Sequence, residues 1–160
     1  MELTTPAAAS PEIVAGALRA ALEQGPEAFR RCLESLYAEE VILRHEPALS
    51  VDGLVDGRRL AEATEAEAVA ITSALDGQHY GPSDVVVDGG TVTIRTSLEG
   101  LLPSGEAASL PTHMICGVAD GRIVALTHRM GADAMAAWLR VAVAGGLLGE
   151  EEAARLASND

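Results

Sequence analysis

The sequence predicts an α+β domain in which helices come first and an antiparallel sheet follows. Apolar residues recur at helical spacing over residues 11–24, 26–37 and 58–75. From residue 80 onward they alternate with polar residues, as in strands that bury one face. Helices and antiparallel strands that are segregated along a chain form a sheet curled over the helices, because each element must bury its apolar face against another.

The helices carry their own boundary signals. Ser10 is placed to cap the first helix, Pro11 suits its first position, and Gly25-Pro26 ends it and begins the second. Asp56 is placed to cap the third helix, which ends at Asp76-Gly77. The residues around each boundary therefore agree with the helical spacing between them.

The predicted strands are short and joined by turns. A small hairpin over residues 41–43 and 51–55 separates the second and third helices. Gly89-Gly90 and Asp120-Gly121 are two-residue turns. The later elements are strands over residues 84–88, 91–98, 112–118 and 122–130 and helices over residues 132–148 and 150–156. The domain organisation that we expect is a flexible N-terminus over residues 1–10, one domain over 11–131 and a C-terminal helical extension over 132–160.

The composition excludes several classes of protein. The chain of 160 residues has no lysine, so it cannot form a lysine Schiff base or use a phosphate-loop lysine. Its formal charge of −13 and its shortage of aromatic residues argue against a nucleic-acid partner. The sequence shows no signal peptide and no apolar stretch long enough to span a bilayer. We therefore expect a cytoplasmic protein without a membrane partner.

Three short motifs, in their order and spacing, resemble one fold family. Residues 36–41 (LYAEEV) resemble its step from helix to first strand, Glu46-Pro47 followed by residues 55–57 (VDG) resembles its hairpin, and residues 120–124 (DGRIV) resemble its turn into the last strand. The family is the nuclear transport factor 2-like superfamily, which includes ketosteroid isomerases, SnoaL-like polyketide cyclases and limonene epoxide hydrolase. The resemblance covers roughly residues 12–131. It implies a cone-shaped, curved antiparallel sheet wrapped around the N-terminal helices, with a C-terminal helical extension.

Two histidines are the first candidates for acid/base chemistry. If Asp120 and Gly121 form the whole turn, His113 lies directly opposite His128 on one face of the sheet. Opposed Cβ atoms lie about 5 Å apart, and two imidazoles at that distance disfavour each other's protonation. The resemblance puts His128 where the epoxide hydrolases carry a catalytic aspartate, so we expect it to be a general acid or base. A bulge in the hairpin would break the pairing, and a purely structural histidine pair is the alternative.

The end of the first strand offers a second candidate. Glu46 resembles the aspartate with which ketosteroid isomerases move a proton at the mouth of their pocket. His45 is the alternative, because a change of register by one residue swaps which of the two side chains points inward. The tyrosine and aspartate that complete the oxyanion site of steroid isomerases have no counterparts in this sequence. We therefore do not expect steroid isomerase activity itself.

The strand over residues 91–98 holds a third candidate. Arg95, followed by Ser97 and by the LPSG sequence at residues 102–105, resembles a pattern of limonene epoxide hydrolase. Ser97 and His128 stand where that enzyme has two aspartates, so the carboxylate base that would activate water is missing. Alternation along the strand puts its apolar residues on one face and Arg95 on the other, which favours solvent for Arg95. Both orientations of Arg95 stay open at this point.

The remaining candidates would line a hydrophobic pocket. The resemblance places Leu126 and Met130 at pocket-facing positions, beside Ser97 if that residue points inward. Tyr37 and Trp138 are two of the few aromatic rings available to such a pocket, and Trp138 lies on the helix that often closes the pocket mouth in this fold. The histidines at positions 45, 113 and 128 match no standard zinc spacing, so we predict neither a metal nor a cofactor.

Two kinds of function fit these residues. The first is a cofactor-independent enzyme of the isomerase, cyclase or hydrolase type that performs acid/base catalysis on an apolar small molecule. The second is a non-catalytic module of the same fold that binds a small molecule or dimerises, and the resemblance implies a homodimer that pairs through the sheet. Fold alone does not choose between them. We favour the enzyme, because several titratable residues converge on the expected pocket.

Overall fold

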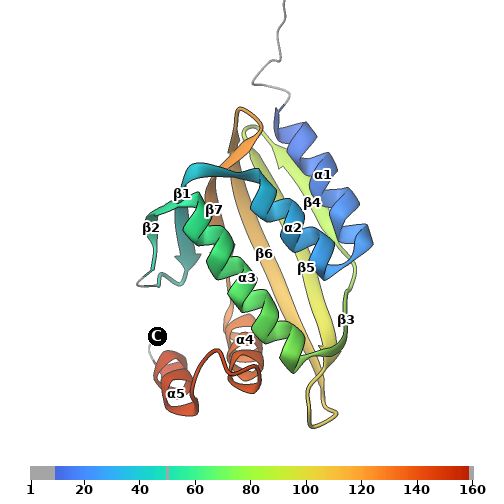
Figure 1. The fold of residues 1–160 in the computed structure, drawn as a ribbon, viewed down its shortest axis with the longest axis vertical. Helices are drawn as coiled ribbons and strands as arrows, with labels where there is room; N and C mark the ends of the chain where they lie inside the picture. The colour runs from blue at the N-terminus through green and yellow to red at the C-terminus, as the bar shows by residue number, and fades with distance from the viewer. Residues whose placement is uncertain (1–9, 50, 159–160) are drawn as a thin grey trace, which may run out of the picture.

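The computed structural model describes residues 10–49 and 51–158 (Figure 1). The predicted flexible N-terminus falls on residues 1–9, which lie outside the described residues, and on Ser10, which is helical. The elements of the described part are α1 (Ser10–Gln24), α2 (Pro26–Leu36), β1 (Tyr37–Glu46), β2 (Gly53–Asp56), α3 (Gly57–Ala74), β3 (Asp76–Tyr80), β4 (Asp84–Asp88), β5 (Thr91–Leu101), β6 (Ala107–Ala119), β7 (Arg122–Arg129), α4 (Ala132–Ala144) and α5 (Glu150–Ser158).

The seven strands of the described residues form one curved sheet. Their order is β2-β1-β7-β6-β5-β3, and β4 also pairs with β5. All the pairs are antiparallel except β1 with β7, which run parallel. The predicted α+β class is confirmed, with a curved sheet around N-terminal helices and helices at the C-terminus. The sheet is mixed because β1 meets β7, and a parallel pair needs a long connection, which most of the chain supplies here.

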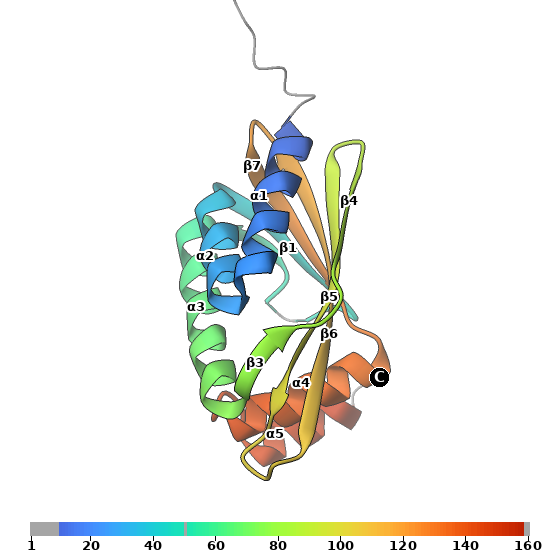
Figure 2. The same ribbon diagram turned by 90° about the vertical axis from the view of Figure 1, so that its right-hand side faces the viewer.

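The helices α1, α2 and α3 cover one face of the sheet, as Figure 2 shows. We call this the helix-covered face and the opposite one the open face. In β5, Val92 and Ile94 are fully buried on the helix-covered face, whereas Arg95 is exposed on the open face. The main core fills the space between helices and sheet and includes Leu18 and Val41. Each large apolar side chain buried there contributes about 1.5–3 kcal/mol to stability.

A second apolar cluster attaches α4 to the sheet. Ala137 and Val141 of α4 pack with Leu75, at the end of α3, and with Leu110 of β6. The helix α4 begins on the side of the open face and runs toward α3, as Figure 2 shows. It therefore brings its own side chains to the far end of the helix-covered face.

In the described part of the chain, no helix combines the length and apolar character that crossing a membrane requires.

Three of the four predicted caps and two-residue turns are confirmed, including Gly89-Gly90 between β4 and β5. Asp56 caps α3, since its Oδ1 accepts the backbone N–H of Arg58 at 2.9 Å and of Arg59 at 3.1 Å. Asp120 and Gly121 form the turn between β6 and β7, with φ angles of 52° and 74°. Ser10 is different: its buried hydroxyl has no hydrogen-bond partner among the described residues, so the expected cap is not made there.

The register between β6 and β7 corrects one prediction. Near the turn the pairing is as expected, but it shifts by one residue at Gly117, because Val124 is an extra residue on β7. His128 consequently pairs with Met114 and not with His113. Neighbouring residues of a strand point to opposite faces, so His113 lies on the open face and His128 on the helix-covered face. The predicted His113–His128 pair is therefore wrong.

Candidate active site

Two histidines from adjacent parallel strands lie side by side on the helix-covered face. His45 of β1 is in register with His128 of β7, and their rings stack with centroids 5.2 Å apart and planes 18° apart. Each follows a buried leucine of the main core on the same face of its strand, Leu43 and Leu126 respectively. The structure thus brings His128 together with His45, the residue that the sequence left as an alternative to Glu46.

Asp52 holds His45 in one orientation. Its Oδ1 lies 2.6 Å from His45 Nδ1, and its Oδ2 accepts the backbone N–H of His45 at 2.9 Å and of Leu49 at 3.2 Å. Burial alone would raise the pKa of Asp52, but these hydrogen bonds outweigh it and lower the pKa. The ionised carboxylate can only accept, so Nδ1 carries a proton. In a neutral His45 ring, Nε2 then carries no proton and is the atom that can accept one.

His128 is held in its neutral form. Burial and the neighbouring His45 lower its pKa to about 4, and the Asp52 charge opposes this shift only in part. At neutral pH the ring therefore offers one N–H donor and one acceptor. Its neighbours within β6 and β7 on this face are apolar: Met114 beside it on β6 and Leu126 two residues earlier on β7. A neutral imidazole in such a setting can donate a hydrogen bond to a developing negative charge.

A glutamate from α3 completes the cluster. Burial raises the pKa of Glu67, while a hydrogen bond from the Trp138 side chain and the nearby His45 lower it in part. A carboxyl group whose pKa is raised by burial can donate a proton at a pH where an exposed glutamate cannot. We call His45, Asp52, Glu67 and His128 the histidine site. Within residues 10–49 and 51–158, no three His, Cys, Asp or Glu side chains are grouped so that they could hold a metal ion.

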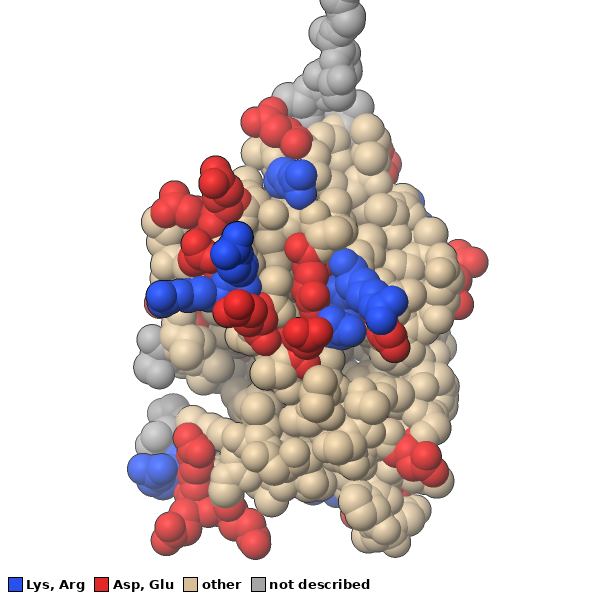
Figure 3. Space-filling view, viewed as in Figure 1, with Lys and Arg blue, Asp and Glu red and all other residues tan. Residues whose placement is uncertain are grey.

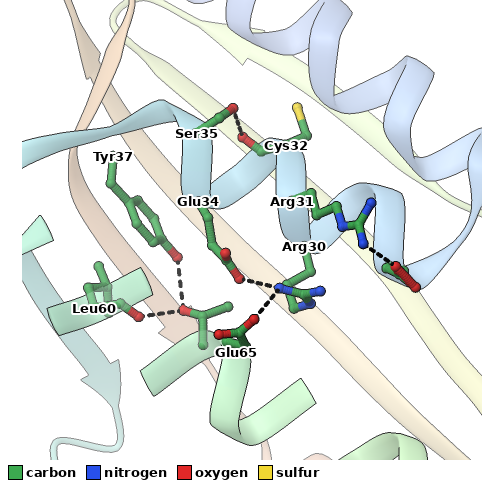
Figure 4. A network of polar contacts seen from close by, with 10 residues as sticks. Arg30, Arg31, Cys32, Glu34, Ser35, Tyr37, Leu60 and Glu65 are labelled. Atoms are coloured by element: carbon green, nitrogen blue, oxygen red, sulfur yellow. Dashed lines mark hydrogen bonds and ion pairs between the residues drawn. The ribbon is translucent and has the colours of Figure 1, made fainter. Parts of the chain in front are cut away.

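Tyr37 links the start of β1 to α3, the helix that carries Glu67 (Figure 4). Its phenol oxygen lies 3.3 Å from Thr64 Oγ1, which donates to the carbonyl oxygen of Leu60 at 2.8 Å. Burial raises the pKa of Tyr37 to about 12, so the phenol stays protonated. At the surface, Arg30 of α2 forms ion pairs with a glutamate of its own helix and with one of α3. These contacts fix α3, and Glu67 lies about one turn beyond Thr64.

The surface near the histidine site is mostly uncharged. Acidic and arginine side chains gather over α2 and the first half of α3, and further acidic side chains lie on α5 (Figure 3). Between these two areas the surface carries few charges and is hollowed below the hairpin of β1 and β2. His45 and Asp52 belong to this hairpin and to the segment that closes it. An apolar molecule would meet less competing charge here than over the helices.

Four predicted site residues lie on the open face, away from the histidine site. Glu46 is exposed there, and its Oε1 accepts from Arg129 Nε at 2.7 Å. Arg95 and Ser97 also face away from the helices, as the alternation along β5 indicated. His113 shares this face because of the bulge in β7. The expectation that these residues would join His128 in one pocket is therefore not met.

The predicted ligand-binding residues are divided in the same way. Leu126 is fully buried in the main core, and Tyr37 is buried beside Thr64. Trp138 is partly buried and reaches Glu67, as described above. Met130 follows β7, and its backbone N–H donates to the carbonyl oxygen of Glu46 at 2.8 Å. Of these residues, Trp138 touches the histidine site directly.

Sequence reasoning missed two members of the site. Asp52 falls in the segment predicted as the return strand of the hairpin, but it lies just before β2 and its carboxylate points back to His45. Glu67 stood in a helix rich in alanine and glutamate. Its spacing from Leu60, Thr64 and Ile71 places it on the buried side of α3, and this spacing was the available signal.

Comparisons with solved structures identify the fold. A protein from Jannaschia sp. CCS1, provisionally named a SnoaL-like polyketide cyclase, matches with a TM-score of 0.51 and 16% identity over 80% of this chain and 90% of its own. An NTF2-like protein from Anabaena variabilis matches with a TM-score of 0.56 and 17% identity over 79% and 92%. An LEH-like epoxide hydrolase from M. tuberculosis matches with a TM-score of 0.52 and 15% identity over 86% and 95%.

The chain has the NTF2-like fold, and the resemblance stated from its motifs is confirmed at the level of the fold. Other structures with this similarity include a protein with a ketosteroid isomerase-like fold. No protein-family profile matches the sequence, and neither does any curated protein. At these low identities the likeness concerns the backbone, so the chemistry must be argued from the side chains of this chain.

Proposed function

We propose that the protein is a cofactor-independent acid/base catalyst that moves a proton on an apolar, carbonyl-bearing small molecule, with the histidine site as its active site. The observation that carries this proposal is the His45–Asp52 pair beside the neutral His128. A histidine oriented by an ionised carboxylate is a common arrangement for a general base. The nearest side chains of the sheet are apolar, which suits an apolar substrate.

Each residue of the site has a distinct role in this proposal. His45 Nε2 takes a proton from the carbon next to the carbonyl group, and the electron pair of the broken C–H bond moves into an enolate. The N–H of His128 donates to the enolate oxygen. The proton returns to carbon from the His45 imidazolium, or from Glu67 with the His45 imidazolium then giving its proton to Glu67, so no oxidant, reductant or co-reactant is needed. Asp52 is a positioning residue, since both its oxygens are engaged by His45 and Leu49.

The test uses a small enolisable probe, the unconjugated isomer of cyclohexenone. Conversion to the conjugated ketone is followed by ultraviolet absorbance, and exchange of its α-protons in heavy water by NMR. We expect His45→Gln to lower the rate about 100-fold and Asp52→Asn at least about tenfold, since general-base catalysis contributes about 10²–10⁴. The matched control is His79→Gln, because His79 is exposed on β3 and far from the site in the fold.

The enzyme proposal fails if wild-type protein and the His45→Gln variant process the probe equally fast while both remain folded by circular dichroism. Binding without turnover is a separate outcome. Native mass spectrometry that shows bound ketone in all variants, with no conversion, would favour the non-catalytic binding module that the sequence left open.

A further inference from the structure

The open face carries a second polar cluster, on the opposite side of the sheet from the histidine site. A groove of about 330 Å³ lies where β7 ends and the chain turns into α4. Its lining includes Arg95 of β5, His113 of β6 and Arg129 of β7, together with Gly131 and Ala134 at the start of α4. We call it the arginine groove. Two of the eleven arginines of this acidic chain thus line a single groove.

His113 has an unused hydrogen-bonding atom in this groove. Its Nε2 is buried and has no partner among the described residues. Burial and the charges of Arg95 and Arg129 lower the pKa of His113, and Glu46 opposes this shift only in part. A buried ring nitrogen without a partner is unfavourable, and a bound group could relieve it. The surplus of positive charge that disfavours imidazolium here would favour an anion.

The two arginines differ in how far they are engaged. Arg129 donates to Glu46 at 2.7 Å. Arg95 makes no hydrogen bond or ion pair within residues 10–49 and 51–158, although Asp84 is its neighbour in register on β4. A guanidinium group offers a rigid fork of donors that matches a carboxylate or phosphate. The guanidinium group of Arg95 is therefore available to bind a ligand at the rim of the groove.

The start of α4 adds backbone donors. Gly131 at its N-cap supplies no side-chain cap, so the first N–H groups of the helix keep unused hydrogen-bonding capacity. The groove lining includes both Gly131 and Ala134, and α4 has 13 residues. Asp133 is also in the first turn, but it is exposed and does not line the groove. The positive end of the helix dipole thus points to the same place as the arginines.

We propose that the arginine groove binds a small oxyanion, the carboxylate or phosphate group of a small molecule. Arg95 and Arg129 contact the anion, the His113 ring donates to it, and the first turn of α4 supplies a backbone donor. The volume of the groove lies at the lower end of the range of about 300–1,000 Å³ that is usual for small-molecule sites. The proposal stands apart from the proposed catalysis, because it uses none of the residues of the histidine site.

The experiment titrates the full chain separately with inorganic phosphate and with acetate at constant ionic strength and pH 7. Two-dimensional NMR follows the backbone amides of residues 132–134 and the side chain of His113. We expect saturable chemical-shift changes at these positions with at least one of the two anions. The anion that binds more tightly shows whether the groove prefers phosphate or carboxylate. Arg95→Gln should weaken binding about tenfold or more, as expected for loss of hydrogen bonds to a charged group.

The matched control is Arg58→Gln, which removes the same charge from an exposed position at the start of α3. It should leave the affinity unchanged. A bound anion should also raise the pKa of His113 in the wild-type protein, because its charge favours imidazolium. Absence of saturable shifts with either anion would overturn the proposal, and this includes the case in which a second copy of the chain covers the groove. Equal weakening by the two variants would overturn it as well, because only the net charge would then matter.

Discussion

At the scale of single residues, burial shifts the pKa values of two groups in the histidine site in opposite directions. It lowers the pKa of His128 and raises that of Glu67, because burial always penalises the charged form. Both groups are thereby shifted toward neutrality. Asp52 keeps its charge because three hydrogen bonds support the carboxylate. The fixed negative charge of the site therefore lies next to His45 Nδ1, where it holds the ring in one orientation.

Trp138→Phe tests the contact between α4 and the site. Loss of the indole N–H removes a hydrogen bond that lowers the pKa of Glu67, so this pKa should rise further while the ring is kept. The stability of the fold should fall by about 1 kcal/mol. Carbon NMR of the side-chain carboxyl groups measures the first effect and urea unfolding the second. The exposed Glu62 on the same helix is an internal reference, and an unmoved Glu67 titration would contradict the contact.

At the scale of elements, local patterns predicted most of the helices and strands. Alternation along β5 placed Arg95 away from the helices, and Asp56 caps α3 as predicted. The errors come from features that a local pattern does not contain. One extra residue, Val124, shifts the register of β7 and sends His113 to the other face from His128. Nothing in the sequence around Val124 distinguishes this bulge from a regular strand.

The site was harder to predict than the fold because its members come together only through tertiary structure. His45 and His128 are neighbours because β1 and β7 pair in parallel. A parallel pair has no short turn between its strands, so no turn motif in the sequence predicts it. Glu67 reaches them from α3, and Trp138 from α4. Each of these contacts joins segments that are far apart in the chain. The sequence could therefore supply His45 and His128 as candidates but not their partnership.

The contact between α3 and the end of α4 depends on a glycine. A Cβ atom at Gly145 would lie 2.3 Å from the carbonyl oxygen of Ala70 on α3, so Gly145→Ala forces the two helices apart. We expect a loss of about 1–3 kcal/mol in the free energy of unfolding, as in other overpacked sites. A weaker Trp138–Glu67 contact should accompany it. Urea unfolding followed by circular dichroism and by Trp138 fluorescence measures both effects.

Gly16→Ala is the matched control for this substitution. Gly16 lies in the middle of α1, is exposed, and would meet nothing within 4 Å of an added Cβ atom. Alanine should therefore stabilise the protein by about 0.5–1 kcal/mol, because it reduces the entropy of the unfolded chain. If both substitutions had the same effect, the close approach of α3 and α4 at Gly145 would not be present in solution.

At the scale of the whole molecule, the two faces of the sheet have different chemistry. The helix-covered face holds buried neutral groups and one supported carboxylate, whereas the open face holds Arg95, Arg129 and Glu46 near the surface. Because of the bulge in β7, His128 lies on the helix-covered face and His113 on the open face. Neutrality of His128 inside the fold has a consequence for stability, because an unfolded chain protonates that ring at its ordinary pKa.

His128 should make the protein less stable as the pH falls from about 6.5 to about 4. Its pKa is 6.5 unfolded and about 4 folded, so in this window the unfolded state binds the extra proton. The full stability is present above pH 6.5, and about 3 kcal/mol of it is lost by pH 4. His113 acts in the same sense and Glu67 in the opposite one, so the difference between wild type and His128→Leu isolates His128. Urea unfolding across the window should show a shallower pH dependence for His128→Leu but not for His79→Gln. Equal slopes in all three proteins would mean that His128 is not buried in its neutral form.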